Sequence, residues 1–517
     1  MEKLKKLPIG IQTFDTLRKD DRIYVDKTER IFDLVNDNGK CFFLSRPRRF
    51  GKSLLITTLD AYFSGKKELF QGLAIGNLEK EWRKYPVLRL DLSGVNYDCK
   101  DVLIEKLQYN LKDWCKKYDI TIEQKDVSIA FGAMIKSLYH KTNSQIVLLI
   151  DEYDKPLIDT INKTSLQEEL RNILHGFYAN IKANDEYIRF AILTGVSHFS
   201  KLSIFSGLNN LQDISLSKKY FDICGISEKE LEPNFEPHIR RLATQTNLSY
   251  SDCVKKLKQY YDGYHFAENT MGIYNPFSLT NAFAQDKFGT YWVDTGTPTF
   301  LVECLKNNTY SFDKLTDTGI TANKLSDIRP KDNDPRPLFY QTGYLTIKDY
   351  NELFDEYTLK YPNREVEESF LNFVLPYYFV NKSGNNFSVV DFIKDVMQGD
   401  IEAFLKKLKI FFSDVPYDMT SRYESYYQII LYILFKLMGF YIKAEYRTSN
   451  GRIDLLLQTN TDTYIIELKV NGTAQQALEQ INNKQYSIPF EQNNTHLTKI
   501  GIAFNEKERN LEDWIIE

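Results

Sequence analysis

The sequence predicts an α/β multidomain protein with a parallel α/β domain first, a mostly helical middle region next, and a second α/β domain last. Three observations lead to this prediction. The chain has 517 residues, more than one hydrophobic core usually holds, so about two to four domains are expected. Short apolar runs alternate with helix-like segments as far as Cys224. Two strand-like runs joined by a polar turn lie near the C-terminus.

Four apolar runs define the first domain, which we expect to span residues 1–224. They begin at Cys41 (CFFLS), Pro86 (PVLRLDLSG), Ile146 (IVLLIDEYD) and Tyr187 (YIRFAILTGVS). Runs with so few interruptions are typical of strands that are covered on both faces of a parallel sheet.

The strand-like runs stop at Gly225, and helical, Tyr-rich sequence predicts a mostly helical region over residues 225–380. The polar segment NKSGNN at 381–386 predicts a loop or linker. Residues 387–517 then predict leading helices, a strand, a hairpin and a helix, which together form the last domain.

The composition is that of a globular protein, with 43% hydrophobic and 26% charged residues. The formal net charge of -4 provides no global basic field, so any contact with DNA has to come from a local patch or from bound metal. The six cysteines are scattered without a CxxC pair, which excludes a disulfide framework and favours a reduced, cytoplasmic compartment. We expect no membrane partner, because the longest apolar run, residues 429–442, is too short to cross a bilayer.

A phosphate-binding loop is predicted directly after the first strand. Gly51, Lys52 and Ser53 form the second half of a Walker A motif and open a helical pattern. Backbone N–H groups at a helix N-terminus bind phosphate oxygens, Lys52 would reach the β- and γ-phosphates, and Ser53 would ligate Mg²⁺. Arg46 stands where the motif has its first glycine. The alternative is a basic loop that contains GKS by chance.

The strand at 146–150 runs into Asp151 and Glu152, the arrangement of a Walker B motif. Asp151 would hold the water shell of Mg²⁺, and Glu152 would polarise the attacking water. Thr194 or Ser197, at the end of the next strand, would sense the γ-phosphate. A solvated acidic turn is the alternative for the two carboxylates alone, but together with the GKS loop they predict ATP binding.

These segments resemble the bacterial AAA-ATPase-like family. The resemblance covers most of residues 7–310 and rests on LPIGIQTFDTLR, YVDKTERI, FFLSRPRRFGKSLL, IDEYDKPL, YDGYHF, YNPFSL and YWVDTGTPTFLVE. In that family an Arg-rich loop replaces the usual first glycine, so the resemblance implies nucleotide binding despite Arg46. Arg48 and Arg49 would contact phosphate or stay solvated. ATPases of this type often act as multimers, so a homo-oligomer is one expected assembly.

A second group of candidate site residues lies on the hairpin predicted from the segments GRIDLLL and YIIELK. If the hairpin centres between Asn460 and Thr461, residues whose numbers sum to 921 are opposed, and Asp454 faces Glu467. Lys469 shares the face of Glu467 because it is two residues further along the strand. Opposed carboxylates repel unless a cation such as Mg²⁺ bridges them, and Lys469 would then orient or deprotonate a metal-bound water. The alternative is an exposed face on which Lys469 neutralises one acid.

The elements around this hairpin complete the pattern. Glu424 lies in the first turn of a helix predicted at 421–438, and Gln480 lies in the helix that follows the hairpin. The layout E…D…ExK…Q over residues 415–510 resembles the PD-(D/E)XK nuclease superfamily. By that resemblance Asp454 and Glu467 would be metal ligands, Lys469 catalytic and Gln480 supporting, and Glu424 would be a further ligand.

The leading hypothesis is an ATP-regulated or ATP-driven, Mg²⁺-dependent nuclease acting on DNA. A second hypothesis is a nucleotide-dependent switch whose nuclease-like domain only binds nucleic acid or protein partners. A third is an ATPase with a purely structural C-terminal domain. The six histidines form no HxxxH or HxH pair, which counts against a zinc hydrolase.

Overall fold

The computed structural model describes residues 4–197, 210–292, 315–316, 318–325, 334–378, 389–413, 433–434, 437, 441–444, 447–448, 451–452, 455–459, 461–491, 495–505, 507–508 and 510–517. The chain divides into two compact units, Met1–Glu367 and Glu368–Glu517, which we call the first and second unit. The middle region therefore packs mostly with the N-terminal domain.

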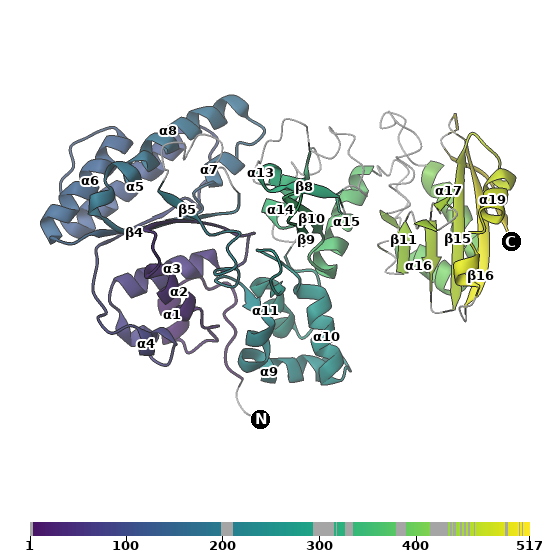
Figure 1. Ribbon diagram of the computed structural model, residues 1–517, viewed down its shortest axis with the longest axis horizontal. Coiled ribbons are helices and arrows are strands. Elements are labelled where there is room, and N and C mark those ends of the chain that lie inside the picture. The colour runs from purple at the N-terminus through teal and green to yellow at the C-terminus, as the bar shows by residue number, and fades with distance from the viewer. Residues whose placement is uncertain are drawn as a thin grey trace. The chain divides into compact units, whose positions relative to one another are not determined.

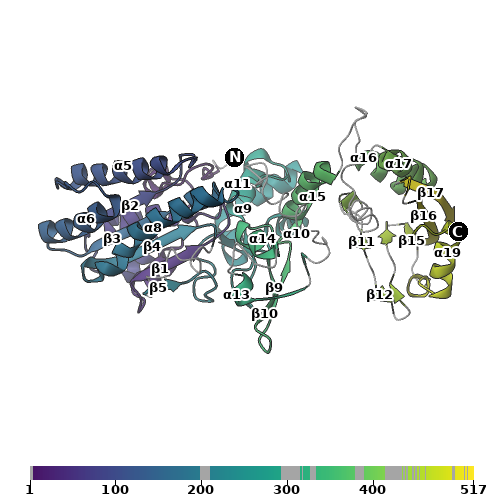
Figure 2. The ribbon, with the colours of Figure 1, turned by 90° about the horizontal axis from the view of Figure 1, so that it is seen from above.

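A five-stranded parallel sheet forms the centre of the first unit. Its strands are β1 (Cys41–Ser45), β2 (Val87–Asp91), β3 (Ile146–Asp151), β4 (Ile188–Gly195) and β5 (Leu211–Asp213). They lie in the order β2-β3-β4-β1-β5, and every neighbouring pair is parallel (Figure 2). The four predicted strands are confirmed, whereas the short β5 was not predicted. All the carboxyl ends lie at one edge, where parallel α/β sheets bind ligands.

Helices cover both faces of this sheet (Figure 1). One face carries α1 (Phe14–Lys19), α2 (Thr28–Val35), α3 (Lys52–Phe63), η1 (Lys67–Phe70) and α4 (Ile75–Leu78), and the other carries α5 (Lys100–Tyr118), α6 (Val127–Thr142) and α8 (Thr164–Ala183). Short helices α7 (Lys155–Ile158) and η2 (Asp185–Tyr187) connect the elements. The strands β1 and β3 are buried along their whole length, which explains their uninterrupted apolar sequence.

The middle region is mostly helical, as predicted. A small helical core is built from α9 (Glu228–Gln245), α10 (Tyr250–Tyr261) and α11 (Pro276–Gln285), with the strand pair β6 (Ile226–Ser227) and β7 (Ile273–Tyr274) beside it.

The middle region also contains an antiparallel three-stranded sheet that the sequence did not predict. It is formed by β8 (Gly319–Thr321), β10 (Glu356–Lys360) and β9 (Thr346–Asn351), in that order. Helices α13 (Ala322–Leu325), α14 (Arg336–Thr342) and α15 (Arg364–Tyr378) accompany it.

The second unit is built on a mixed sheet in the order β11-β14-β15-β16-β17. The strands are β11 (Tyr441–Ala444), β14 (Leu455–Gln458), β15 (Asp462–Val470), β16 (His496–Asn505) and β17 (Asn510–Ile516). Only the β15–β16 pair is parallel, and α19 (Ala474–Asn483) makes the crossover that such a pair needs. The sequence predicted the hairpin and α19 but not the strands β16 and β17 after them.

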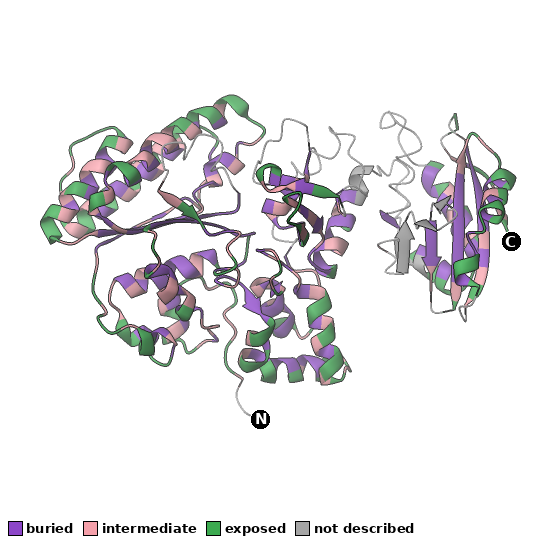
Figure 3. Ribbon diagram, viewed as in Figure 1, coloured by how far each residue is buried: buried purple, intermediate pink, exposed green. Residues whose placement is uncertain are grey.

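Two apolar layers enclose this sheet, and the buried strands stand out in Figure 3. Tyr464, Ile466 and Leu468 of β15 pack with helices α16 (Val389–Met397) and α17 (Ile401–Ser413). Ile465 belongs to the opposite layer, with Leu478 and other residues of α19 and the following η7 (Ile488–Phe490). Side chains of a strand alternate between faces, so odd-numbered residues of β15 share the face of α19. A short ribbon of β12 (Arg447–Thr448) and β13 (Gly451–Arg452) completes the unit.

Candidate functional sites

The phosphate loop connects β1 to α3. Its backbone conformation explains why the chain has the second glycine of the Walker A motif, Gly51, and not the first. Gly51 has a φ of 91° and precedes the first helical residue, Lys52. Arg49 is the other residue of the loop with a positive φ, at 69°. Arg46 does not adopt a positive φ, so its position does not need glycine on conformational grounds.

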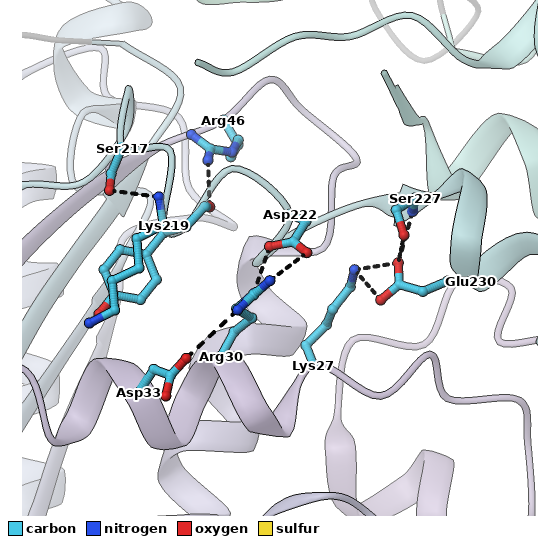
Figure 4. A network of polar contacts seen from close by, with 10 residues as sticks. Lys27, Arg30, Asp33, Arg46, Ser217, Lys219, Asp222, Ser227 and Glu230 are labelled. Atoms are coloured by element: carbon cyan, nitrogen blue, oxygen red, sulfur yellow. Dashed lines mark hydrogen bonds and ion pairs between the residues drawn. The ribbon is translucent and has the colours of Figure 1, made fainter. Parts of the chain in front are cut away.

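Arg46 is buried at the loop, with 2% of its surface exposed, and its hydrogen bonds stabilise the loop from inside. Its guanidinium donates to the carbonyl oxygens of Ser45, Ser215 and Tyr220 at 2.8, 2.8 and 3.1 Å. It also lies 4.2 Å from the ring centroid of Phe266, and burial lowers its pKa. The planar, multi-donor guanidinium thus joins the loop to the chain after β5, a role a glycine there would not fill (Figure 4).

Lys52 lies within the curve of the loop and is 7% exposed. Its ammonium group donates to the carbonyl oxygens of Arg46 at 2.9 Å and Pro47 at 3.0 Å. Burial lowers the pKa of Lys52, and the nearby carboxylates of Asp151 and Glu152 oppose that shift. A phosphate group placed against the loop would meet a cation that is already desolvated and oriented.

The acidic side of the site comes from the end of β3. Asp151 is 1% exposed and accepts hydrogen bonds from the Thr194 hydroxyl at 2.6 Å and from the backbone N–H of Glu152 at 3.1 Å. Glu152 has a φ of 51°, a conformation rare for a non-glycine residue and common at functional sites. Burial raises the pKa of the Glu152 carboxyl, and Asp151 adds to this shift.

Asp154 is a further buried carboxylate that the sequence reasoning missed. It accepts hydrogen bonds from the backbone N–H groups of Val196 and Ser197 at 3.0 and 2.6 Å and from the Ser197 hydroxyl at 2.5 Å. Burial raises its pKa. A Cβ atom on Gly195 would lie 2.5 Å from the Asp154 Oδ1 atom, so the glycine makes this approach possible. The available signal was the run DEYD, which places three acids within four residues.

A cavity of about 480 Å³ joins these groups, within the size range of small-molecule sites. Of the residues predicted to bind nucleotide, Arg48, Arg49, Gly51, Lys52, Ser53 and Glu152 line it. Asp151 and Thr194 are not in the lining, because they are buried and bonded to each other. Two further walls were not predicted: the segment around Gln12 and the first turn of α11, where Phe277 lies 4.6 Å beneath the Arg49 guanidinium.

Two ion pairs of the first unit start from α2 and the residue before it, and one of them joins the N-terminal domain to the middle region. Lys27, just before α2, lies 2.6 Å from Glu230 of α9, and Arg30 of α2 lies 2.9 Å from Asp222 (Figure 4). Lys27 is 9% exposed, so its pair is screened little by solvent. The Lys27–Glu230 pair thus fixes α9, on which α11 packs, to the N-terminal domain.

The second site lies on β15 in the second unit. Its pairing with β14 joins Leu455 to Ile466 and continues to Gln458 and Thr463, so the paired numbers sum to 921 as predicted. Asp454 and Glu424 lie outside the described residues, as does most of the helix predicted at 421–438.

Glu467, Lys469 and Gln480 meet on the α19 face of β15. Glu467 is 2% exposed, and the Lys469 ammonium lies 3.7 Å from its Oε1 atom. The Gln480 amide joins the two: its nitrogen donates to Glu467, and its oxygen accepts from Lys469. A Cβ on Gly501 of β16 would lie 2.3 Å from the Ala474 carbonyl oxygen, so this glycine lets α19 approach the sheet.

Within the described ranges, no group of three or more His, Cys, Asp or Glu residues has an arrangement that could hold a metal ion. Glu467 is the only one of the three predicted ligands of the second site that falls inside those ranges. The same part of the chain contains no helix that combines the length and apolar character needed to span a membrane.

Comparison with known proteins agrees with both halves of this arrangement. A family model described as a predicted AAA-ATPase matches residues 8–205, and one described as the PD-(D/E)XK nuclease superfamily matches residues 422–514. The chain belongs to the family of predicted AAA-ATPases that carry a C-terminal PD-(D/E)XK nuclease superfamily domain.

A relative with the same extent comes from Azotobacter chroococcum mcd 1, where it is described as an uncharacterized protein in the vnfD 5' region. The two are 34% identical over 527 residues, which cover 99% of each chain.

Proposed function

We propose that the first unit binds and hydrolyses ATP in the cavity at the phosphate loop. The loop N–H groups, Lys52, Arg48 and Arg49 bind phosphate oxygens. The desolvated ammonium of Lys52 and its place inside the loop support this assignment. The cavity volume of about 480 Å³ leaves room for more than a phosphate group.

Ser53 and Asp151 would hold Mg²⁺ in this unit, because a hydroxyl and a carboxylate are the hard oxygen donors that the ion prefers. When bound, the ion neutralises charge on the transferred phosphoryl group. Glu152 orients the attacking water, and its raised pKa makes it a stronger base than an exposed carboxylate. Thr194 would relay the presence of the γ-phosphate through its hydrogen bond to Asp151.

For the second unit we propose Mg²⁺-dependent cleavage of DNA phosphodiesters. Asp454 and Glu467 hold the ion in this proposal, with Glu424 as a further ligand, and the ion would activate a water and polarise the phosphoryl group. The buried carboxylate of Glu467 suits such a role. Lys469 orients the attacking water, and Gln480 fixes both charged groups relative to each other.

The contact of Glu467, Lys469 and Gln480 on one face is the observation that carries the nuclease proposal. The Lys469 ammonium group lies beside the buried carboxylate of Glu467, and the amide of Gln480 contacts both. These are the three groups that the sequence pattern ExK…Q predicts at one site. The second candidate is a nucleotide-dependent switch in which this domain only binds nucleic acid or protein. The net charge of -4 favours it, because an acidic chain attracts DNA weakly.

The test uses the full chain with DNA and with RNA, each with and without Mg²⁺ and ATP. We expect Mg²⁺-dependent cutting of DNA that is lost in Lys469→Ala and altered in Lys52→Ala. Cutting should be retained in Lys484→Ala, because Lys484 is an exposed residue directly after α19. Cutting that survives in Lys469→Ala would contradict the nuclease proposal. ATP-dependent binding without cleavage under any metal would favour the switch.

A further inference from the structure

The phosphate loop is touched from outside by an aromatic residue of the middle region. Trp292 is 5% exposed, and its indole N–H donates to the carbonyl oxygen of Arg48 at 3.1 Å. Tyr344 packs against the indole with ring centroids 5.1 Å apart. A Cβ on Gly343 would lie 2.6 Å from the Pro47 Cβ atom and 3.2 Å from Trp292, so the loop, Gly343 and Trp292 are in close contact.

This contact sets the orientation of one peptide group. In a trans peptide the carbonyl oxygen and the following N–H point in opposite directions. A carbonyl of Arg48 held by Trp292 therefore directs the N–H of Arg49 away from Trp292. Both arginines line the cavity, whereas Trp292 does not. Arg49 also has a positive φ of 69°, a conformation that non-glycine residues adopt rarely.

A buried carboxylate fixes Trp292 in turn. Glu365 is 0% exposed, and its Oε1 atom accepts from the backbone N–H groups of Tyr291 and Trp292 at 2.5 and 2.9 Å. Because two consecutive backbone N–H groups donate to this one oxygen, the Glu365 side chain fixes the backbone of Tyr291 and Trp292. Glu365 lies in the first turn of α15, and α15 runs from Arg364 to Tyr378, past the division between the two units at Glu367.

We propose that Trp292 and Glu365 are positioning residues of the nucleotide site. Trp292 holds the Arg48 carbonyl so that the Arg49 N–H is available to a phosphate oxygen, and Glu365 holds Trp292. The first turn of α15 is therefore connected to the phosphate loop through Glu365 and Trp292. By this connection, nucleotide binding stabilises the helix that leads into the nuclease-like unit. This inference rests on the proposed binding of ATP.

The experiment measures the affinity of the full chain for Mg²⁺-ATP and for tripolyphosphate, together with hydrogen exchange of α15. Trp292→Phe removes the N–H donor and keeps an aromatic ring. Trp82→Phe is the matched control, because the Trp82 indole N–H has no acceptor among the described residues. Glu365→Gln keeps an acceptor oxygen, Glu365→Ala removes it, and Glu367→Gln controls for a charge change on the same helix.

We expect Trp292→Phe to weaken binding of both ligands by about two- to tenfold, the effect of one hydrogen bond, with Trp82→Phe unchanged. ATP should slow exchange over residues 364–378 in the wild type, and this protection should be lost in Trp292→Phe and Glu365→Ala and rescued in Glu365→Gln. Equal affinity and equal protection in Trp292→Phe and Trp82→Phe would overturn the positioning role alone. No binding of ATP to the wild type would overturn the proposed ATPase, and this inference with it.

Discussion

Gln480 offers a direct measure of how firmly the candidate nuclease site is assembled. Gln480→Ala removes one amide that donates to Glu467 and accepts from Lys469. Hydrogen bonds to charged groups contribute about 1.5–3 kcal/mol each, and Gln480 is only half-buried, so we expect a loss of about 3 kcal/mol for the two. Alanine is a strong helix former, so α19 itself should not weaken.

The assay is native-state hydrogen exchange of the full chain without added metal, with peptides that cover β15 and α19. A loss of about 3 kcal/mol corresponds to exchange faster by about a hundredfold through local opening. Gln475→Ala is the matched control: Gln475 is exposed on the same helix, and its amide donates to Glu479 at 3.2 Å. Such a surface contact contributes about 0.2–0.5 kcal/mol. Equal exchange in the two variants would refute the argument that Gln480 holds the two charged groups in place.

Three further predictions concern the first unit. Glu152→Gln should retain ATP binding and lower hydrolysis by about a hundredfold or more, measured as steady-state phosphate release with Lys52→Ala as the non-binding reference. Burial raises the pKa of Glu152, so its active carboxylate form is lost as the pH falls through that raised value. Hydrolysis by the wild type should therefore decline at a higher pH than an ordinary glutamate would give. A decline centred at or below about pH 4.3 would contradict this prediction. Gly195→Ala should destabilise the first unit by about 1–3 kcal/mol in thermal unfolding, because the new Cβ would lie 2.5 Å from atoms of Tyr153 and Asp154; an unchanged midpoint would show that the strand relaxes freely.

Local sequence patterns were sufficient for the elements that carry the chemistry. The strand and loop around Lys52 are contiguous in sequence, so their order alone predicted a helix N-terminus at a strand end. The β14–β15 register follows from a polar turn of few residues, which leaves little freedom for slippage. The pairing of Glu467 with Gln480 followed only from the family resemblance, because a crossover helix can be placed in several ways.

What sequence could not predict depends on contacts between distant segments. The guanidinium of Arg46 donates hydrogen bonds to residues about 170 positions further along the chain. The sequence around the loop therefore could not show that Arg46 stabilises it. The same holds for Phe277 of α11 as a cavity wall. The strands β9 and β10 were missed because their sequences, TIKDYN and EYTLK, mix charged and apolar residues and are only half-buried.

The role of Glu467 in DNA cleavage is tested by the rate at which the purified chain cleaves linear duplex DNA in Mg²⁺, compared between Glu467→Gln and Glu479→Gln. Both variants neutralise one glutamate of the second unit, but Glu467 is buried in the candidate site and Glu479 is exposed on α19. We expect a loss of about a hundredfold or more for Glu467→Gln and a change within about twofold for Glu479→Gln. Equal cleavage by the two variants would contradict a role of Glu467 in cleavage.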